Sequence, residues 1–363
     1  MSEEIEIDEL KDPDFTEDDF NEAPPSDIVA YNELRSCADL VRMYEEKILD
    51  IQPEFQRDVV WKPAAQTRFI DSLMKQLPIP SMCFALDYKE DRWIVIDGLQ
   101  RMTTIIRYLM GDDWRLSRLD DVSPKIAGVS AAAMKNAKGE LRSLFARVQN
   151  QALPINVLRC DFSKKTHMEY LFTIFHRLNA GGAKLNNQEI RNCIYSGPFN
   201  NLLRELDTDE DWMAINRMKP GEAYRFVKQE IILRFFAFLD RPEEYKGQIA
   251  KFLNDYMYEN RAPDEDFLDS KTETFERTVG LIAEKIFPDG PEARIPTSVM
   301  EALLVSIANN IDALEGQRSS QLKRKYRLLR ENKEFTEEAV AEGLSKVDKV
   351  GNRFSAANAI FSA

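Results

Sequence analysis

The stretch "RWIVIDGLQRMTTIIRYLMG", Arg92–Gly111, joins a predicted strand to a predicted helix. Strand-forming residues run from Trp93 to Ile96, and after Asp97 and Gly98 the apolar residues recur at helical spacing. A turn over glycine between a strand and a helix often holds phosphate in proteins, because the first amides of a helix have no partner within it. The stretch therefore raises the question of whether this turn binds a nucleotide or only starts a helix.

Two interpretations of the turn stay open on local sequence. In the first, Asp97 is the N-cap of the helix and Gln100 bonds back to the Asp97 backbone, which is close to a capping box and needs no ligand. In the second, Gly98 lets a phosphate approach the backbone, Arg101 adds a bidentate contact, and Asp97 holds a divalent cation or orients an attacking water. The second interpretation includes Thr104, further along the helix. The chain contains no GxxxxGK[ST] sequence, so this turn is not a Walker A loop.

The net charge of −13 is concentrated at the N-terminus. Residues 1–27 hold twelve Asp or Glu and one Lys, which leaves 50 acidic against 48 basic residues in the remainder. A segment so charged and so poor in apolar residues is predicted to be a disordered acidic tail. It either solubilises the protein or mimics a nucleic acid that covers a basic surface.

The rest of the chain predicts an α+β fold in two domains. Helical spacing over Leu34–Ile48, a hairpin over residues 81–98 and a strand over 153–162 predict a small mixed sheet with helices in residues 28–200. Strand signals then fade, and residues 201–363 predict an all-helical domain.

The composition bears on the compartment. No apolar run approaches the eighteen or so residues of a membrane span. The four cysteines form no CxxC pair and are predicted to be reduced, mostly buried thiols. These features favour a cytoplasmic protein with no membrane partner.

Two further stretches carry candidate ligand-binding residues. "FQRDVVW", residues 55–61, places Arg57 among apolar anchors, and "FHRLNAGGAKLNNQEIRN", residues 175–192, ends a helix near Asn179. The alternative without a function is that Arg57 is a solvated surface arginine and that residues 175–192 form an ordinary helix–turn–helix. If functional, Asn179 beside an exposed backbone would bind a phosphate, a sugar or a base edge.

Taken together, these stretches resemble the N-terminal domain family of GmrSD-type, modification-dependent restriction systems. The resemblance covers about residues 48–258, and its main pieces are "FQRDVVW", "VIDGLQRMTTI", "FHRLNAGGAKLNNQEIRN" and "YRFVKQEIILRFFAF". Leu99 stands where the family usually has the first glutamine of its D-G-Q-Q-R motif, which removes one polar contact.

The resemblance implies a ParB/sulfiredoxin-like fold that binds and hydrolyses a nucleoside triphosphate with Mg²⁺. Arg101 would hold phosphates, Asp97 would position metal or water, and Arg57 would neutralise developing charge. Carried over by position, the nucleotide site would comprise Gln56, Arg57, Asp97, Gly98, Gln100, Arg101, Thr104, Asn179 and Gly182. Arg225, Glu230 and Arg234 match the fourth piece, and we interpret them as a structural ion-pair set, with an interface role as the alternative.

Related proteins often carry an HNH nuclease domain or act with a partner that supplies one. The only two histidines, His167 and His176, lie on one predicted helix of the first domain. An HNH site needs a histidine base and further metal ligands, so the printed sequence predicts no HNH site and implies a separate nuclease or defence subunit.

A basic segment, "RSSQLKRKYRLLRENK" at residues 318–333, is the candidate nucleic-acid surface. Its apolar residues share one helical face, so the basic ones are expected to point largely outward. The candidate DNA-contacting residues are Lys323, Arg324, Lys325, Arg327 and Arg330. The alternative is a solvated helix that pairs with the acidic tail.

The sequence thus favours a nucleoside triphosphatase subunit of a prokaryotic system that senses DNA modification and acts against phage. Two alternatives remain: a ParB-like regulator that binds nucleotide or DNA without turnover, and a metal-dependent nuclease that uses the ParB-like pocket. The preferred nucleotide, the DNA modification and whether the chain forms a homo-oligomer are left open.

Overall fold

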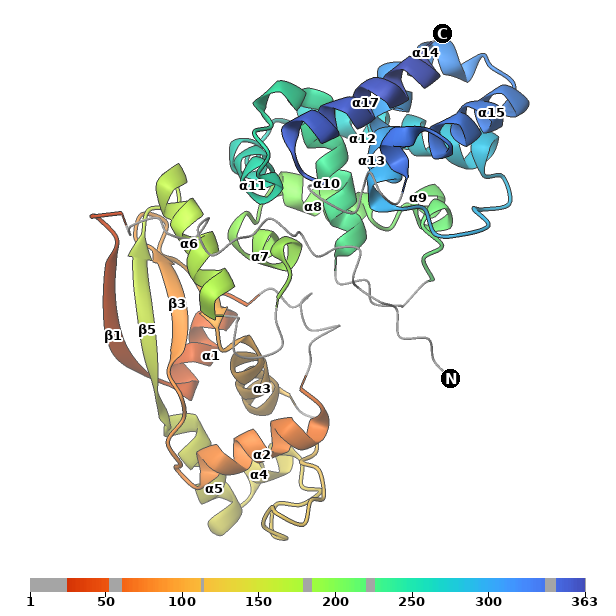
Figure 1. The fold of residues 1–363 in the computed structure, drawn as a ribbon. Helices are drawn as coiled ribbons and strands as arrows, with labels where there is room; N and C mark the ends of the chain where they lie inside the picture. The colour runs from red at the N-terminus through yellow and green to blue at the C-terminus, as the bar shows by residue number, and fades with distance from the viewer. Residues whose placement is uncertain are drawn as a thin grey trace. The chain divides into compact units, whose positions relative to one another are not determined.

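The computed structural model describes residues 25–51, 61–111, 114–178, 185–219, 226–336 and 344–362. Its described residues form two compact units, one that ends at Leu185 and one that begins at Asn186. We call them the sheet unit and the helical unit (Figure 1). The predicted acidic tail lies outside the described residues as far as residue 24.

A five-stranded mixed sheet forms the framework of the sheet unit, as the sequence predicted. Its strands lie in the order β1 (Val29–Ser36), β5 (Ala152–Cys160), β3 (Met82–Asp87), β4 (Arg92–Asp97) and β2 (Leu49–Asp50). The outer pair β1–β5 and the hairpin β3–β4 are antiparallel, whereas β5–β3 and β4–β2 are parallel. The predicted hairpin over residues 81–98 is therefore confirmed.

Helices pack on both faces of this sheet. One face carries the main core, to which α1 (Cys37–Glu45), α2 (Pro63–Met74), α3 (Leu99–Met110), α4 (Ala131–Asn136) and α5 (Glu140–Asn150) contribute. Trp93 and Val95 of β4 belong to that core, so the alternating residues Ile94 and Ile96 face the other side. There α6 (Lys165–Leu178) contacts β4 and keeps both isoleucines buried.

The helix predicted over Leu34–Ile48 begins later than expected. Leu34 lies in β1 opposite Pro154, and α1 starts at Cys37. Ser36 is the N-cap, and its hydroxyl accepts a hydrogen bond of 3.1 Å from the Asp39 amide. The long ladder with β5 outweighs the helical spacing of the first residues.

The helical unit confirms the all-helical C-terminal region. It comprises α7 (Asn187–Ile194), α8 (Pro198–Leu206), α9 (Glu210–Ile215), α10 (Val227–Asp240), η5 (Pro242–Glu244), α11 (Ile249–Glu259), α12 (Glu265–Leu281), η6 (Ile282–Ile286), α13 (Thr297–Asn309), α14 (Ile311–Glu315), α15 (Ser319–Arg330), η7 (Lys333–Phe335) and α17 (Val347–Phe361). Helices α10 and α13 are apolar on most sides and pack against each other in the core.

Two composition-based predictions bear on these units. All four cysteines are free and buried, as predicted. Among the described helices, none is both long and apolar enough to span a bilayer.

Candidate nucleotide site

The turn after β4 is a strand-to-helix junction built on glycine. Asp97 is the last residue of the strand, and Gly98 is the N-cap of α3 with φ 101° and ψ 13°, in the left-handed region. Among the residues that the structure describes, no side-chain cap is formed at this helix start. The interpretation of Asp97 and Gln100 as a capping box is therefore wrong, and the first-turn amides of α3 keep their donors for another acceptor.

Gly98 is required here by the packing behind it. A Cβ atom at this position would lie 2.5 Å from Cγ and 2.8 Å from Sδ of Met82, in addition to the strain of a positive φ. The missing side chain thus allows a close approach to a buried methionine of β3. The sequence analysis had instead predicted that the missing side chain lets a phosphate approach the backbone.

Asp97 and Arg101 form an ion pair one helical turn apart. Arg101 Nη2 donates to Asp97 Oδ2 over 2.7 Å, and Arg101 Nη1 donates to the carbonyl oxygens of Pro80 (2.5 Å) and Ser81 (3.4 Å). The Arg101 side chain is 14% exposed and the Asp97 side chain 43%. The guanidinium is therefore held in place by the β3 side of the junction, while the carboxylate faces outward.

The Asp97–Arg101 ion pair does not use all of its hydrogen-bonding donors and acceptors. A guanidinium has five N–H donors, and the contacts above leave Arg101 Nε without an acceptor in the part of the chain that the structure describes. Asp97 Oδ1 likewise accepts from no described donor. Burial first, and the neighbouring Asp97 second, raise the pKa of the Cys83 thiol to about 12.

The two other α3 side chains predicted to bind nucleotide, those of Gln100 and Thr104, form hydrogen bonds inside the fold instead. Gln100 Oε1 accepts a hydrogen bond of 2.8 Å from the backbone amide of Trp61, in place of the predicted bond to Asp97. Thr104 is fully buried, and its hydroxyl donates to the Gln100 carbonyl over 2.7 Å. Gln100 thus fixes the first described residue after the stretch that carries Gln56 and Arg57.

Four predicted site residues, Gln56, Arg57, Asn179 and Gly182, lie outside the described residues. For the predicted Mg²⁺, Asp97 is the one candidate ligand. In the described ranges, no three His, Cys, Asp or Glu side chains gather as a metal site would require. One outward carboxylate nevertheless fits Mg²⁺, which is usually bound through one or two carboxylates together with waters and substrate phosphates.

The histidines lie together on α6, as predicted. His167 is buried, and its Nδ1 accepts a hydrogen bond of 2.9 Å from the Asp161 amide. Because Nδ1 is then unprotonated, Nε2 carries the proton that it shares with Asp27 over 2.9 Å. Contacts from Lys164 first and His167 second lower the pKa of Asp27 to about 2. His167 therefore ties residue 27 to α6.

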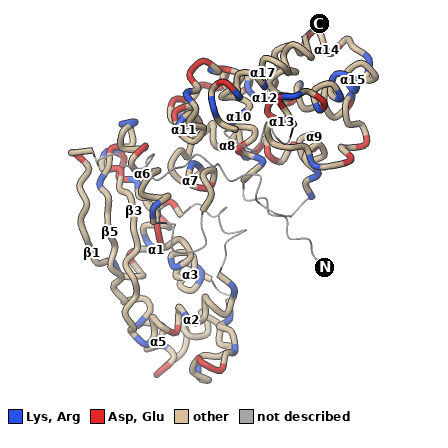
Figure 2. Tube along the Cα trace, in the orientation of Figure 1, with Lys and Arg blue, Asp and Glu red and all other residues tan. Residues whose placement is uncertain are grey.

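Helix α15 presents a basic surface of the helical unit (Figure 2). Leu322 and Leu329 are buried, as predicted. The exposed basic residues are Lys323, Arg324, Arg327 and Arg330, and the first three form no ion pair with any described residue. Lys325 differs, because its Nζ donates over 2.7 Å to the carbonyls of both Ile360 and Ser362, and burial lowers its pKa.

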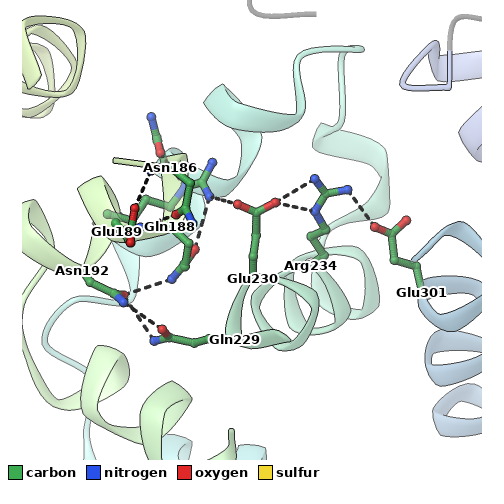
Figure 3. A network of polar contacts seen from close by, with 10 residues as sticks. Asn186, Gln188, Glu189, Asn192, Gln229, Glu230, Arg234 and Glu301 are labelled. Carbon is green, nitrogen blue, oxygen red and sulfur yellow. Dashed lines mark hydrogen bonds and ion pairs between the residues drawn. The ribbon is translucent and has the colours of Figure 1, made fainter. Parts of the chain in front are cut away.

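A buried polar network in the helical unit contains Glu230 and Arg234 (Figure 3). Arg191, 1% exposed, donates to Glu230 over 2.9 Å, and Arg234 bridges Glu230 and Glu301 at 2.8 Å each. Burial opposes ionisation of Glu230, but Arg234 and Arg191 outweigh it and lower its pKa. The structural ion-pair interpretation is confirmed for Glu230 and Arg234, and Arg225 lies outside the described residues.

Sequence reasoning missed the centre of this network. Arg191 also contacts Asn254 (2.9 Å) and Gln188 (3.2 Å), and Asn192 exchanges amide hydrogen bonds with Gln229. The helix itself was predicted: Asn186 caps α7, and Glu189 completes a capping box. A run of polar residues in α7, "NQEIRN" at residues 187–192, was the available signal, but the partners of these residues lie on distant helices.

A known protein family covers the same segment. Residues 37–196 match the family model described as GmrSD restriction endonuclease, N-terminal domain. Residues 37–196 are thus similar to the N-terminal domain of GmrSD-type restriction endonucleases. The match includes the whole junction from β4 to α3, and it ends at Ser196, short of the "YRFVKQEIILRFFAF" piece. No curated protein and no solved structure matched the chain.

Proposed function

We propose that the chain is a component of a restriction system and that its sheet unit binds and hydrolyses a nucleoside triphosphate at the Asp97–Arg101 junction. The observation that carries the proposal is an unsaturated ion pair at an uncapped helix start, inside the segment that matches the GmrSD N-terminal domain. Amides of the first turn of α3 and the spare donors of Arg101 suit phosphate oxygens.

The charge balance of the junction indicates which ligand it takes. Asp97 and Arg101 together are neutral, so a bare phosphate group would be attracted by Arg101 and repelled by Asp97. Mg²⁺ bound with the nucleotide would be held by Asp97 and would offset the negative charge there. Arg101 Nη1 stays fixed on the Pro80 carbonyl, so its guanidinium needs little reorganisation to turn Nη2 toward the phosphate.

The test is binding and phosphate release from GTP, ATP and CTP, with and without Mg²⁺ and with modified or plain DNA. Arg101→Ala should abolish both binding and release. Arg68→Ala is the matched control, because Arg68 forms a 2.6 Å surface ion pair with Asp121 in the same unit. Binding without release would favour the regulator, and nicking of DNA without nucleotide would favour the nuclease. Binding that survives Arg101→Ala would exclude this site.

The proposal assigns DNA contact to α15 of the helical unit. Lys323, Arg324, Arg327 and Arg330 are exposed on one helix, and such a surface tracks backbone phosphates without reading sequence. Replacing Lys323 and Arg327 by Glu should weaken binding to all DNA sequences alike. It should also reduce the slope of log K against log salt by about 1 for each phosphate that the variant no longer neutralises. Lys251→Glu on α11 changes charge elsewhere in the same unit and serves as the control.

A further inference from the structure

Strand β1 ends the sheet with an open edge. It pairs through all eight of its residues with β5, in a regular antiparallel register from Val29↔Arg159 to Ser36↔Ala152. Within the described chain, no strand pairs with its other edge, because β1 stands first in the strand order. The outward backbone N–H and C=O groups are therefore available to another strand.

Apart from the charged residues Glu33 and Arg35, the usual devices that protect such an edge are missing from β1. Its sequence, VAYNELRS, contains no proline, lysine or glycine, and its register shows no bulge. Large apolar side chains are exposed along it: Val29 (48%), Tyr31 (37%) and Leu34 (72%). Leu34 is the most exposed large hydrophobic side chain of the described residues. A long and regular edge with exposed apolar side chains favours pairing with a further strand.

We propose that β1 pairs with β1 of a second copy, antiparallel, around a twofold axis at Leu34. Residues whose numbers sum to 68 are then opposite each other, so Leu34 faces Leu34, Glu33 faces Arg35, and Asn32 faces Ser36 of the other copy. Each copy therefore contributes an acid and a base to two equivalent cross-strand pairs.

The charges select this register over its nearest neighbours. Moving the twofold axis by one residue in either direction, to Glu33 or to Arg35, would place two Glu33 or two Arg35 side chains directly opposite, and like charges there are destabilising. In each copy Glu33 and Asp39 already bind the Arg35 guanidinium, which lies 4.9 Å from the Trp93 ring, so a cross-strand pair would add a Glu33 from the other copy to an existing cluster of charges.

The second copy would also extend the apolar positions on one face of the sheet. On the face that carries Leu34, the neighbouring positions are Ala30 of β1 and Pro154 and Leu158 of β5, which are exposed or half-buried. Joining the two edges gives one continuous sheet from two five-stranded ones. This inference is independent of the nucleotide site, which lies on β4 and α3.

The experiment is analytical ultracentrifugation of the full chain over a range of concentrations. We expect a monomer–dimer equilibrium, and Leu34→Glu should raise its dissociation constant by about tenfold or more, because two carboxylates would meet at the axis. Leu77→Glu, at a 47% exposed leucine of the same unit, should leave it unchanged. A monomer at every concentration, or a dimer that Leu34→Glu does not affect, would overturn the proposal.

A mixing test checks the register itself. Glu33→Arg and Arg35→Glu each place like charges opposite one another in their own homodimers, so each should dimerise weakly. Mixed together they restore both opposite-charge pairs and should form a heterodimer. Thermal melts of each variant establish that it folds, and Leu34→Cys should cross-link under oxidation while Leu77→Cys does not. Failure of the folded variants to form a heterodimer would contradict the Leu34 register.

Discussion

Two acid–arginine pairs with the same sequence spacing have different surroundings in this molecule. Asp97 and Arg101, and Glu230 and Arg234, are each four residues apart and each joined over 2.7–2.8 Å. Glu230 is also bound by Arg191, and Arg234 by Glu301, so that the helical unit encloses a charge network with each member paired. Asp97 instead keeps an outward oxygen. The difference between a structural pair and a candidate ligand site therefore lies in unused hydrogen-bonding capacity.

The largest expected effect comes from breaking the enclosed network. Glu230→Gln leaves Arg191, which is 1% exposed, without its carboxylate and should lower the unfolding free energy by about 3–5 kcal/mol. Chemical denaturation followed by far-UV circular dichroism measures this. The lowered pKa of Glu230 means that its stabilisation is present above about pH 4.5 and is lost as pH falls through the folded-state pKa. A variant as stable as the parent protein would show that the network is not structural.

A smaller loss should follow at the junction when its shape is changed. Gly98→Ala adds a Cβ atom 2.5 Å from Met82 Cγ at φ 101°, and should cost about 2–4 kcal/mol. Gly290→Ala is the control, because its φ is also positive (75°) but its Cβ would meet nothing closer than 4.0 Å. Equal losses in thermal melts of the two variants would mean that backbone strain alone accounts for the effect.

The stability contribution of Asp207 depends on pH in the opposite direction from that of Glu230. Asp207 accepts a hydrogen bond of 3.2 Å from Trp212 Nε1, and burial raises its pKa to about 6. Because the folded-state pKa is raised, the protein loses stability as pH rises from about 4 to 6. Asp207→Asn should therefore stabilise the protein by about 1–2 kcal/mol at pH 7 and by little at pH 4. Urea midpoints at both pH values check this, and an equal gain at both would refute the assignment.

The sequence predicted local features well and contacts between distant residues poorly. The β3–β4 hairpin, α6 and the cap of α7 were predicted because turn, periodicity and capping signals are short-range. The roles of Gly98 and Gln100 were not, because Met82 and Trp61 approach them only in the folded chain. Lys325 was likewise predicted to be one of several outward-pointing cations, but in the folded chain its Nζ donates to the carbonyls of Ile360 in α17 and of Ser362 just after it.

Asp97→Asn should have the smallest effect on stability and the largest effect on nucleotide binding. Asp97→Asn removes an ion pair whose carboxylate is 43% exposed, and pairs of this kind contribute about 0–1 kcal/mol. The thermal midpoint should therefore stay close to that of the parent protein, because Arg101 keeps its contacts with Pro80 and Ser81. If Asp97 holds Mg²⁺ with the nucleotide, the variant should bind nucleotide more weakly in the presence of Mg²⁺ and depend less on it, as titration calorimetry with and without the metal would measure. A variant that loses several kcal/mol of stability but binds Mg²⁺–nucleotide unchanged would place Asp97 with Glu230, as part of the structural framework.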